Sequence, residues 1–148
     1  MGGDQAMIAG VGCRRGCLAE DIVALVRAAE AAAGARATRL AAPAAKSGEA
    51  GLRGAAAALG LPILWVEHAA LAAAQARCVT RSACAERALG VASVAEGCAL
   101  AAAGEGGRLV LERIASPRAT CALAAPALTV PLFCDRPIAL PLAGEGSP

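Results

Sequence analysis

The chain has 148 residues and a formal net charge of +2, with basic and acidic residues interspersed. This length suits one domain of ordinary size. Trp65 and Phe133 are the only aromatic residues, so the sequence offers neither the basic patch nor the stacking rings of a nucleic-acid-binding protein.

The mean hydropathy of +0.57 is high. The longest charge-free run, residues 119–134, nevertheless contains prolines and falls short of the roughly 20 apolar residues that span a membrane. The N-terminus also lacks the features of an export signal, which predicts a cytoplasmic protein without membrane contact.

The chain contains seven cysteines and a single histidine, His68. An odd number of cysteines in a chain without an export signal favours reduced thiols over a disulfide framework. No Cys-x-x-Cys pair occurs, and His68 lies far in sequence from the cysteine pairs. We therefore expect no metal site and no cofactor.

Residues 6–17 hold a short apolar run, a glycine-rich turn and the start of a helical pattern, in that order. The first N–H groups of a helix lack backbone partners and lie at the positive end of its dipole. A turn that leads into a helix is therefore suited to receive an anion. Arg14 and Arg15 add positive charge to this turn.

The glycines of this turn allow other interpretations. Gly10, Gly12 and Gly16 have the spacing Gly-x-Gly-x-x-x-Gly, and Arg15 stands where the dinucleotide-binding fingerprint requires its third glycine. A nucleotide-binding domain is therefore the weaker alternative. A plain tight turn, with glycines at positive φ and solvated arginines, explains the same residues. The pair of arginines favours anion binding.

Strands and helices alternate after this turn. Glu20 and Asp21 lie in the first turn of the next helix, where carboxylates suit the helix dipole, and Gly34 is placed to end that helix. The predicted helices cover 20–33, the stretch from loop 43–49 to Leu59, and 67–75; the predicted strands cover 38–42 and 62–66. The last of these strands is wholly apolar, which is typical of a strand buried on both faces.

The loop before the second helix contains Lys46, Ser47 and Glu49. We expect Ser47 to be the N-cap of this helix and Glu49 to lie in its first turn. Lys46 is a cation at the exit of a strand.

Because ligands collect at the carboxyl ends of parallel strands, we expect Arg14, Arg15 and Lys46 to lie on one edge of the sheet. His68 follows the third strand and could join them. A lone histidine is more often a hydrogen-bonded residue at the start of a helix than a catalyst.

The second half of the sequence begins with a loop and a short predicted helix at 82–89. Ser93 and Glu96 then have the spacing of a capping box before an alanine-rich helix that ends at Gly104. The carboxylate of Glu96 therefore has a local structural role available to it.

Two strand-like runs, 107–115 and 119–125, flank Ser116-Pro-Arg118, which predicts a hairpin. The predicted fold class is α/β: a single layered domain, residues 1–125, whose mixed sheet is mostly parallel with a C-terminal hairpin and is flanked by helices. Repeated prolines in 126–148 predict an extended tail.

Several motifs occur together in a specific order. They are Gly10-Val-Gly-Cys-Arg-Arg-Gly16, Lys46-x-x-Glu49 followed by Leu52 and Leu59-Gly-Leu-Pro62, Val91-Ala-Ser-Val-Ala-Glu96 with Ala99-Leu100, and the strand pair 109–111 and 119–122. In this order the chain resembles the CobE and CbiG C-terminal family of cobalamin-biosynthesis proteins over residues 6–125. Ala42 and Ala44 stand where CbiG proteins tend to have threonine and aspartate, and the long N-terminal region of CbiG is missing. Both departures favour a stand-alone CobE-like protein.

The resemblance implies a role in the corrin pathway, whose tetrapyrrole intermediates carry acetate and propionate side chains. The favoured interpretation is an accessory protein that binds a polycarboxylate corrin or precorrin intermediate, with corrin-pathway methyltransferases as further candidate partners. The residues expected to bind the ligand are Gly10, Gly12, Arg14, Arg15, Gly16, Lys46, Glu49 and Glu96. The alternative is a hydrolase that opens the ring lactone of a precorrin-5 type intermediate, with Glu96 or His68 activating water. The sequence leaves the question of enzymatic activity open.

Overall fold

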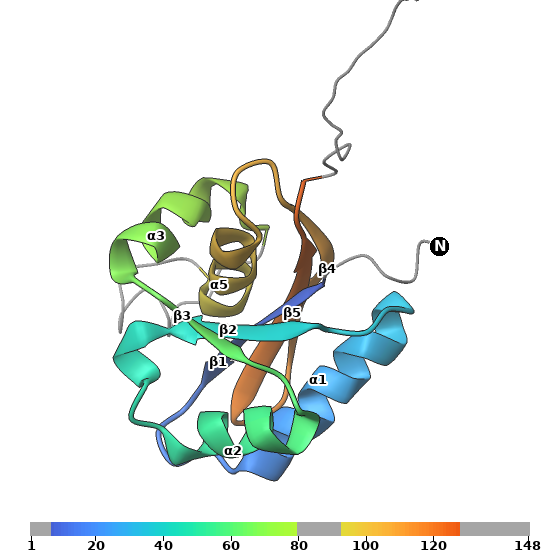
Figure 1. Ribbon diagram of the computed structural model, residues 1–148, viewed down its shortest axis with the longest axis vertical. Coiled ribbons are helices and arrows are strands. Elements are labelled where there is room, and N and C mark those ends of the chain that lie inside the picture. Colours follow the sequence, from blue (N-terminus) through green and yellow to red (C-terminus); the bar gives the residue numbers. More distant parts are fainter. Residues whose placement is uncertain (1–6, 80–92, 128–148) are drawn as a thin grey trace, which may run out of the picture.

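A mixed five-stranded sheet with the strand order β3-β2-β1-β5-β4 forms the centre of the molecule (Figure 1). The structure is a computed structural model that describes residues 7–79 and 93–127. The parallel strands are β1 (Ile8–Cys13), β2 (Arg39–Pro43) and β3 (Ile63–Val66); the antiparallel strands are β4 (Arg108–Ala115) and β5 (Ala119–Ala125). The predicted α/β class and the predicted C-terminal hairpin are confirmed.

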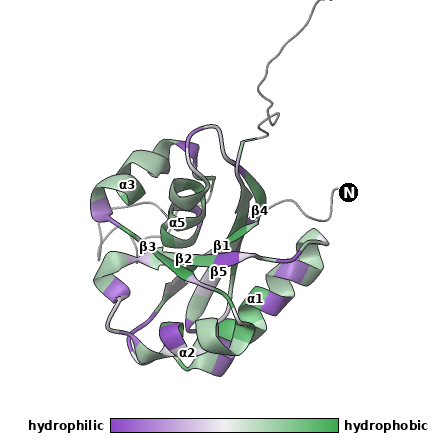
Figure 2. Cartoon of the chain, viewed as in Figure 1, coloured by the Kyte–Doolittle hydropathy of each residue, from purple (hydrophilic) through white to green (hydrophobic). Residues whose placement is uncertain are grey.

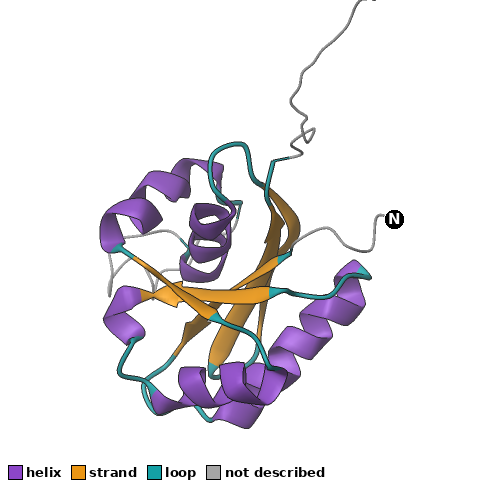
Figure 3. Ribbon diagram, viewed as in Figure 1, coloured by secondary structure: helices purple, strands orange, loops and turns teal. Residues whose placement is uncertain are grey.

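Helices cover both faces of this sheet (Figures 1 and 3). α1 (Ala19–Ala33) and α2 (Ala50–Leu59) contact each other on one face, whereas α3 (His68–Ala73) and α5 (Val94–Ala103) contact each other on the opposite face. In the described part of the chain, no helix is long and apolar enough to span a membrane.

Side chains of β1 alternate between the two faces, as the pleat of a strand requires. Ala9 and Val11 belong to the core cluster beneath α1 and α2, whereas Ile8 belongs to the cluster beneath α3 and α5. Hydrophobic residues dominate α5, whereas α1 carries hydrophilic residues along part of its surface (Figure 2). The many alanines thus let helices and sheet approach closely, and each contributes little buried area.

Gly10 shows how close this approach is. A Cβ atom at Gly10 would overlap the carbonyl oxygen of Ala95 and crowd the backbone nitrogen of Ala99. Only glycine therefore lets α5 lie directly on β1 at this position.

Two helix ends match the prediction from the sequence, whereas the start of α2 differs from it. Gly34 and Gly60 end α1 and α2 in left-handed conformations, with φ of 68° and 70°. The prediction that Ser47 caps α2 is wrong, because Ser47 closes a short 3₁₀ turn and Glu49 occupies the N-cap position. The N–H of Glu49 donates to the carbonyl oxygen of Lys46 at 2.9 Å, which delays the start of α2.

The prediction that strand 62–66 is buried on both faces is also wrong. β3 is an edge strand, where only Val66 is buried and Leu64 is 36% exposed. An apolar run does not reveal whether a strand is central or at an edge, because that depends on the order of strands in the sheet. The predicted helix at 82–89 lies outside the described residues, as does the predicted tail apart from Pro126 and Ala127.

Candidate anion-binding site

Two loops and a turn meet at the edge of the sheet where β1 and β2 end. β2 runs parallel to β1, and β5 begins opposite the last residue of β1, with Cys13 paired to Ala119. The N–H of Arg14 donates to the carbonyl oxygen of Arg118 at 2.9 Å. The turn between β4 and β5 therefore lies beside the loop between β1 and α1.

Glu49 connects the first loop to the second. Its Oε1 accepts a hydrogen bond from the backbone N–H of Gly16 at 3.1 Å. Gly16 has a φ of 77°, a conformation that favours glycine. A Cβ at Gly51 would overlap the carbonyl oxygen of Cys17, so glycine lets α2 approach this loop closely. A carboxylate from the protein thus already occupies one backbone donor of the predicted anion-binding turn.

The cations of this edge are Arg14, Arg15, Lys46 and Arg118. The three arginines are exposed and Lys46 is partly exposed. Within residues 7–79 and 93–127, the one ion pair shorter than 4.0 Å joins Arg27 to Glu30, at 3.6 Å, and these residues lie elsewhere on α1. The edge therefore exposes four cations to solvent, with the carboxylates of Glu49 and Asp21 close by. We call these four residues the cationic edge.

Two cysteine thiols lie at the cationic edge. Burial raises the pKa of Cys13 to about 11, although the nearby Lys46 ammonium acts in the opposite direction. Burial and the Asp21 carboxylate raise the pKa of Cys17, whereas Arg118 lowers it. Both thiols are therefore protonated at neutral pH and are poor nucleophiles. Among the described residues, no cluster of histidine, cysteine and carboxylate side chains could hold a metal ion.

Gly10 and Gly12 are buried under α5, away from the solvent-exposed edge. A Cβ at Gly12 would contact Oγ1 of Thr120 at 2.8 Å and Cγ1 of Val94 at 3.2 Å. Packing of α5 on β1 therefore explains Gly10, and Gly12 is crowded both by Val94 of α5 and by Thr120 of the neighbouring strand β5.

Glu96 lies in the first turn of α5, and its side chain is fully buried. Half of the predicted capping box is present, since Ser93 Oγ accepts the N–H of Glu96 at 3.3 Å. The reciprocal half is wrong, because the N–H of Ser93 donates to Oε1 of Gln75 at 2.9 Å. The carboxyl oxygens of Glu96 accept the backbone N–H groups of Val79 at 2.8 Å and Arg113 at 2.9 Å. Glu96 therefore joins α5 to strand β4 and to the segment after α3.

His68 is the exposed first residue of α3 and follows the outermost strand β3. Strand β2 lies between β3 and β1 in the sheet. No hydrogen bond or ion pair among the described residues joins His68 to the cationic edge.

Arg118 is the member of the cationic edge that the sequence did not identify. The sequence placed Arg118 in the turn of a hairpin. Its position beside Arg14 follows only once β5 pairs antiparallel with β1, which brings the start of β5 to the end of β1. Fold and edge together define an α/β domain with solvent-exposed cations at the ends of its central strands.

Comparisons with known proteins narrow this class. The family model described as Cobalamin synthesis G C-terminus matches residues 7–124. The chain therefore belongs to this family of cobalamin-biosynthesis proteins, as its motifs suggested. No protein with a curated description matches the chain significantly.

Solved structures agree with the family. The crystal structure of CobE, a protein from the cobalamin (vitamin B12) biosynthetic pathway, is similar with a TM-score of 0.77 and 37% identity, over 82% of this chain and 91% of that chain. The cobalamin biosynthesis protein chiG from Agrobacterium tumefaciens is similar with a TM-score of 0.67 and 36% identity, over 82% of this chain and 98% of that chain. A cobalamin biosynthesis protein G homologue from Sulfolobus solfataricus shares the fold, with a TM-score of 0.64 and 20% identity, over 82% of this chain and 37% of that chain.

Proposed function

We propose that this chain is an accessory protein of cobalamin biosynthesis that binds a polycarboxylate corrin or precorrin intermediate at the cationic edge. The observation that carries the proposal is that Arg14, Arg15, Lys46 and Arg118 converge from separate loops without a carboxylate within 4.0 Å in the described part of the chain. The family supplies the pathway, and the charges of the edge suit a ligand with several carboxylates.

Several weak contacts add up in such an interaction. An exposed ion pair contributes about 0–1 kcal/mol because water and salt screen it. Guanidinium groups bind carboxylates with two parallel hydrogen bonds, which adds direction to the attraction. A ligand with carboxylates around its periphery can contact several of these cations at once, whereas a monocarboxylate cannot.

The burial of Glu96 weighs against the hydrolase alternative. The carboxyl group of Glu96 is fully buried and accepts hydrogen bonds from backbone N–H groups. A general base needs to reach the water that it activates. We therefore assign Glu96 to the fold. As part of this proposal, the protein acts in the cytoplasm and presents its ligand to the methyltransferases of the pathway.

The test compares cobyrinic acid, a corrin with free carboxylate side chains, with its methyl ester, in which these carboxylates are esterified. Binding is measured by equilibrium dialysis with detection of the corrin absorbance at low ionic strength. We expect the acid to bind at least about tenfold more tightly than the ester, the ratio that corresponds to two or more exposed ion pairs. Equal binding of acid and ester would overturn the proposal.

A further inference from the structure

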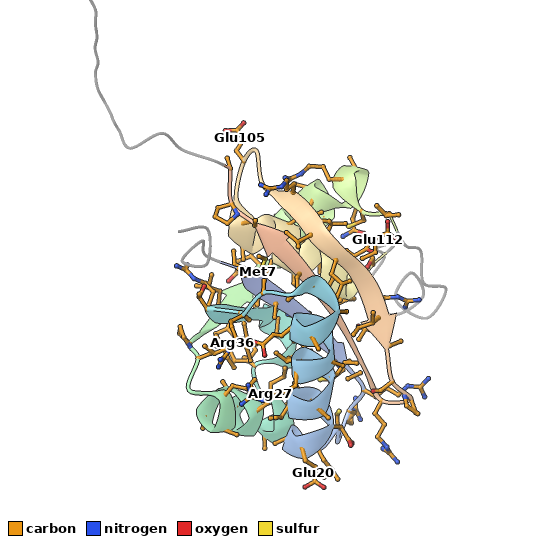
Figure 4. The ribbon with its side chains drawn as sticks, turned by 90° about the vertical axis from the view of Figure 1, so that its right-hand side faces the viewer. Met7, Glu20, Arg27, Arg36, Glu105 and Glu112 are labelled. Atoms are coloured by element: carbon orange, nitrogen blue, oxygen red, sulfur yellow. The ribbon has the colours of Figure 1, made fainter. Side chains whose placement is uncertain are left out.

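A groove lies beside the cationic edge, between α1 and the turn that joins β4 to β5. Figure 4 shows α1 next to this hairpin, with Glu20 marking the lower end of the helix. The groove has a volume of about 320 Å³ and is lined by Asp21, Ala24, Leu25, Ala28, Ser116, Pro117 and Arg118. This volume is at the lower end of the range for small-molecule sites.

The walls of the groove are mainly apolar. Ala24 and Ala28 are one helical turn apart on α1, so their small side chains leave space along one wall. Leu25 is 8% exposed and closes the floor toward the core, and Pro117 stands on the opposite wall. Such a surface favours an apolar group of modest size.

Asp21 and Arg118 give the groove two polar side chains of opposite charge. In the part of the chain that the structure describes, neither side chain takes part in a hydrogen bond or an ion pair. The ion pair found there joins Arg27 to Glu30. Both charges act on the thiol of Cys17, whose pKa is raised by burial and then by Asp21, and lowered by Arg118. The two charges therefore flank the same small region without neutralising each other directly.

We propose that this groove binds a small molecule with an apolar body and a terminal carboxamide. The carboxamide N–H would donate to the Asp21 carboxylate, and its carbonyl oxygen would accept from the Arg118 guanidinium. A ligand carboxylate is attracted to Arg118 but repelled by Asp21. A ligand ammonium group is attracted to Asp21 but repelled by Arg118. A zwitterion would satisfy both side chains, yet moving its charges against apolar walls costs more than moving a neutral amide.

The experiment uses three probes with the same apolar body: 3-phenylpropanamide, 3-phenylpropanoate and 3-phenylpropylamine. Each probe is titrated into ¹⁵N-labelled full-length protein, and dissociation constants are taken from amide chemical shifts around the groove. We expect the amide to bind about fivefold more tightly than either charged probe, which corresponds to about one net hydrogen bond. Either charged probe binding as tightly as the amide, or no shift at the groove residues, would overturn the proposal.

Two substitutions assign the roles of the charges. In Asp21→Asn the repulsion of a carboxylate is removed, so 3-phenylpropanoate should gain affinity until it equals or exceeds the amide. In Arg118→Gln the carboxylate probe should lose most of its binding, while the amine gains. Glu20→Gln is the control, because it removes one negative charge from a residue that is next to Asp21 in the chain but does not line the groove. It should leave all three dissociation constants unchanged. A preference order that stays the same in Asp21→Asn and Arg118→Gln, in proteins that melt like the wild type, would contradict the assignment.

Discussion

The carboxylate of Glu49 lies 3.1 Å from the backbone nitrogen of Gly16, so a side chain at the start of α2 holds the loop that carries Arg14 and Arg15. Glu49→Ala removes this hydrogen bond, and we expect a loss of about 0.5–1.5 kcal/mol in the free energy of unfolding. Glu49→Gln keeps an oxygen acceptor and should stay closer to the wild type. Urea denaturation measures both. An equal loss in the two variants would show that the charge of Glu49, and not its hydrogen bond, is important.

Arg14→Ala combined with Arg15→Ala should weaken the binding of cobyrinic acid at low salt, because it removes two exposed cations from the cationic edge. The loss should shrink at high salt, where screening already weakens the ion pairs. Stability should change by no more than about 0.5 kcal/mol per substitution, as is usual for surface charges. Equilibrium dialysis over a series of salt concentrations measures the effect.

The matched control for this double variant is Arg36→Ala combined with Arg108→Ala. Both residues are exposed, and Arg108 pairs with Ala125 at the opposite end of β5 from Arg118. Arg36 follows the C-terminal end of α1, the opposite end of the helix from Glu20 (Figure 4). The control changes the net charge by the same amount, so a similar loss of binding would show that only overall charge attracts the ligand.

Gly10→Ala should destabilise the domain, because the new Cβ would overlap the backbone of α5 at Ala95. Overpacking of a tight core costs about 1–3 kcal/mol, and backbone on the opposing side cannot rotate out of the way as a side chain can. Gly48→Ala is the control, since a Cβ at Gly48 meets nothing within 4 Å. Thermal melting compares the two variants. A Gly10→Ala protein as stable as Gly48→Ala would mean that α5 lies farther from β1.

Glu96→Gln tests whether the buried carboxyl group serves the fold. Both carboxyl oxygens accept backbone N–H groups, and an amide nitrogen cannot replace one of them. We expect a loss of about 1–3 kcal/mol in the free energy of unfolding. Glu112→Gln, on the exposed surface of β4 (Figure 4), should have an effect within about 0.5 kcal/mol. Lactone-opening activity that disappears in Glu96→Gln while the melting temperature stays unchanged would instead support the hydrolase.

The raised pKa of Cys13 predicts that stability falls in alkaline solution. Its pKa is about 11 in the folded protein and 9.0 in its ordinary state. Between these values the unfolded chain has lost the proton that the folded chain still holds, so raising the pH favours unfolding. Urea unfolding with a reducing agent at pH 8 and pH 10 should show this fall, and Cys13→Ala should show a smaller one. Parallel curves for the two proteins would contradict the assigned pKa.

The local patterns of the sequence predicted most of the secondary structure. Apolar residues at helical spacing identified α1, and the left-handed glycines Gly34 and Gly60 marked the ends of α1 and α2, because these features depend on near neighbours in the chain. The turn residues around Ser116 likewise predicted the hairpin of β4 and β5. The alternation of strands and helices then indicated a parallel sheet, and with it a common edge for Arg14, Arg15 and Lys46.

Only the tertiary structure decided which other residues belong to that edge and what holds them. Arg118 lies beside Arg14 because β5 pairs antiparallel with β1. The side chain of Glu96 does not complete the predicted capping box, because Gln75 accepts the N–H of Ser93, while Val79 and Arg113 supply donors for the carboxyl group. In both cases the partners are distant in sequence. The packing of the whole domain decides which strands pair and which acceptor binds a given N–H group. Local sequence patterns cannot predict these choices, because they depend only on residues that are near one another in the chain.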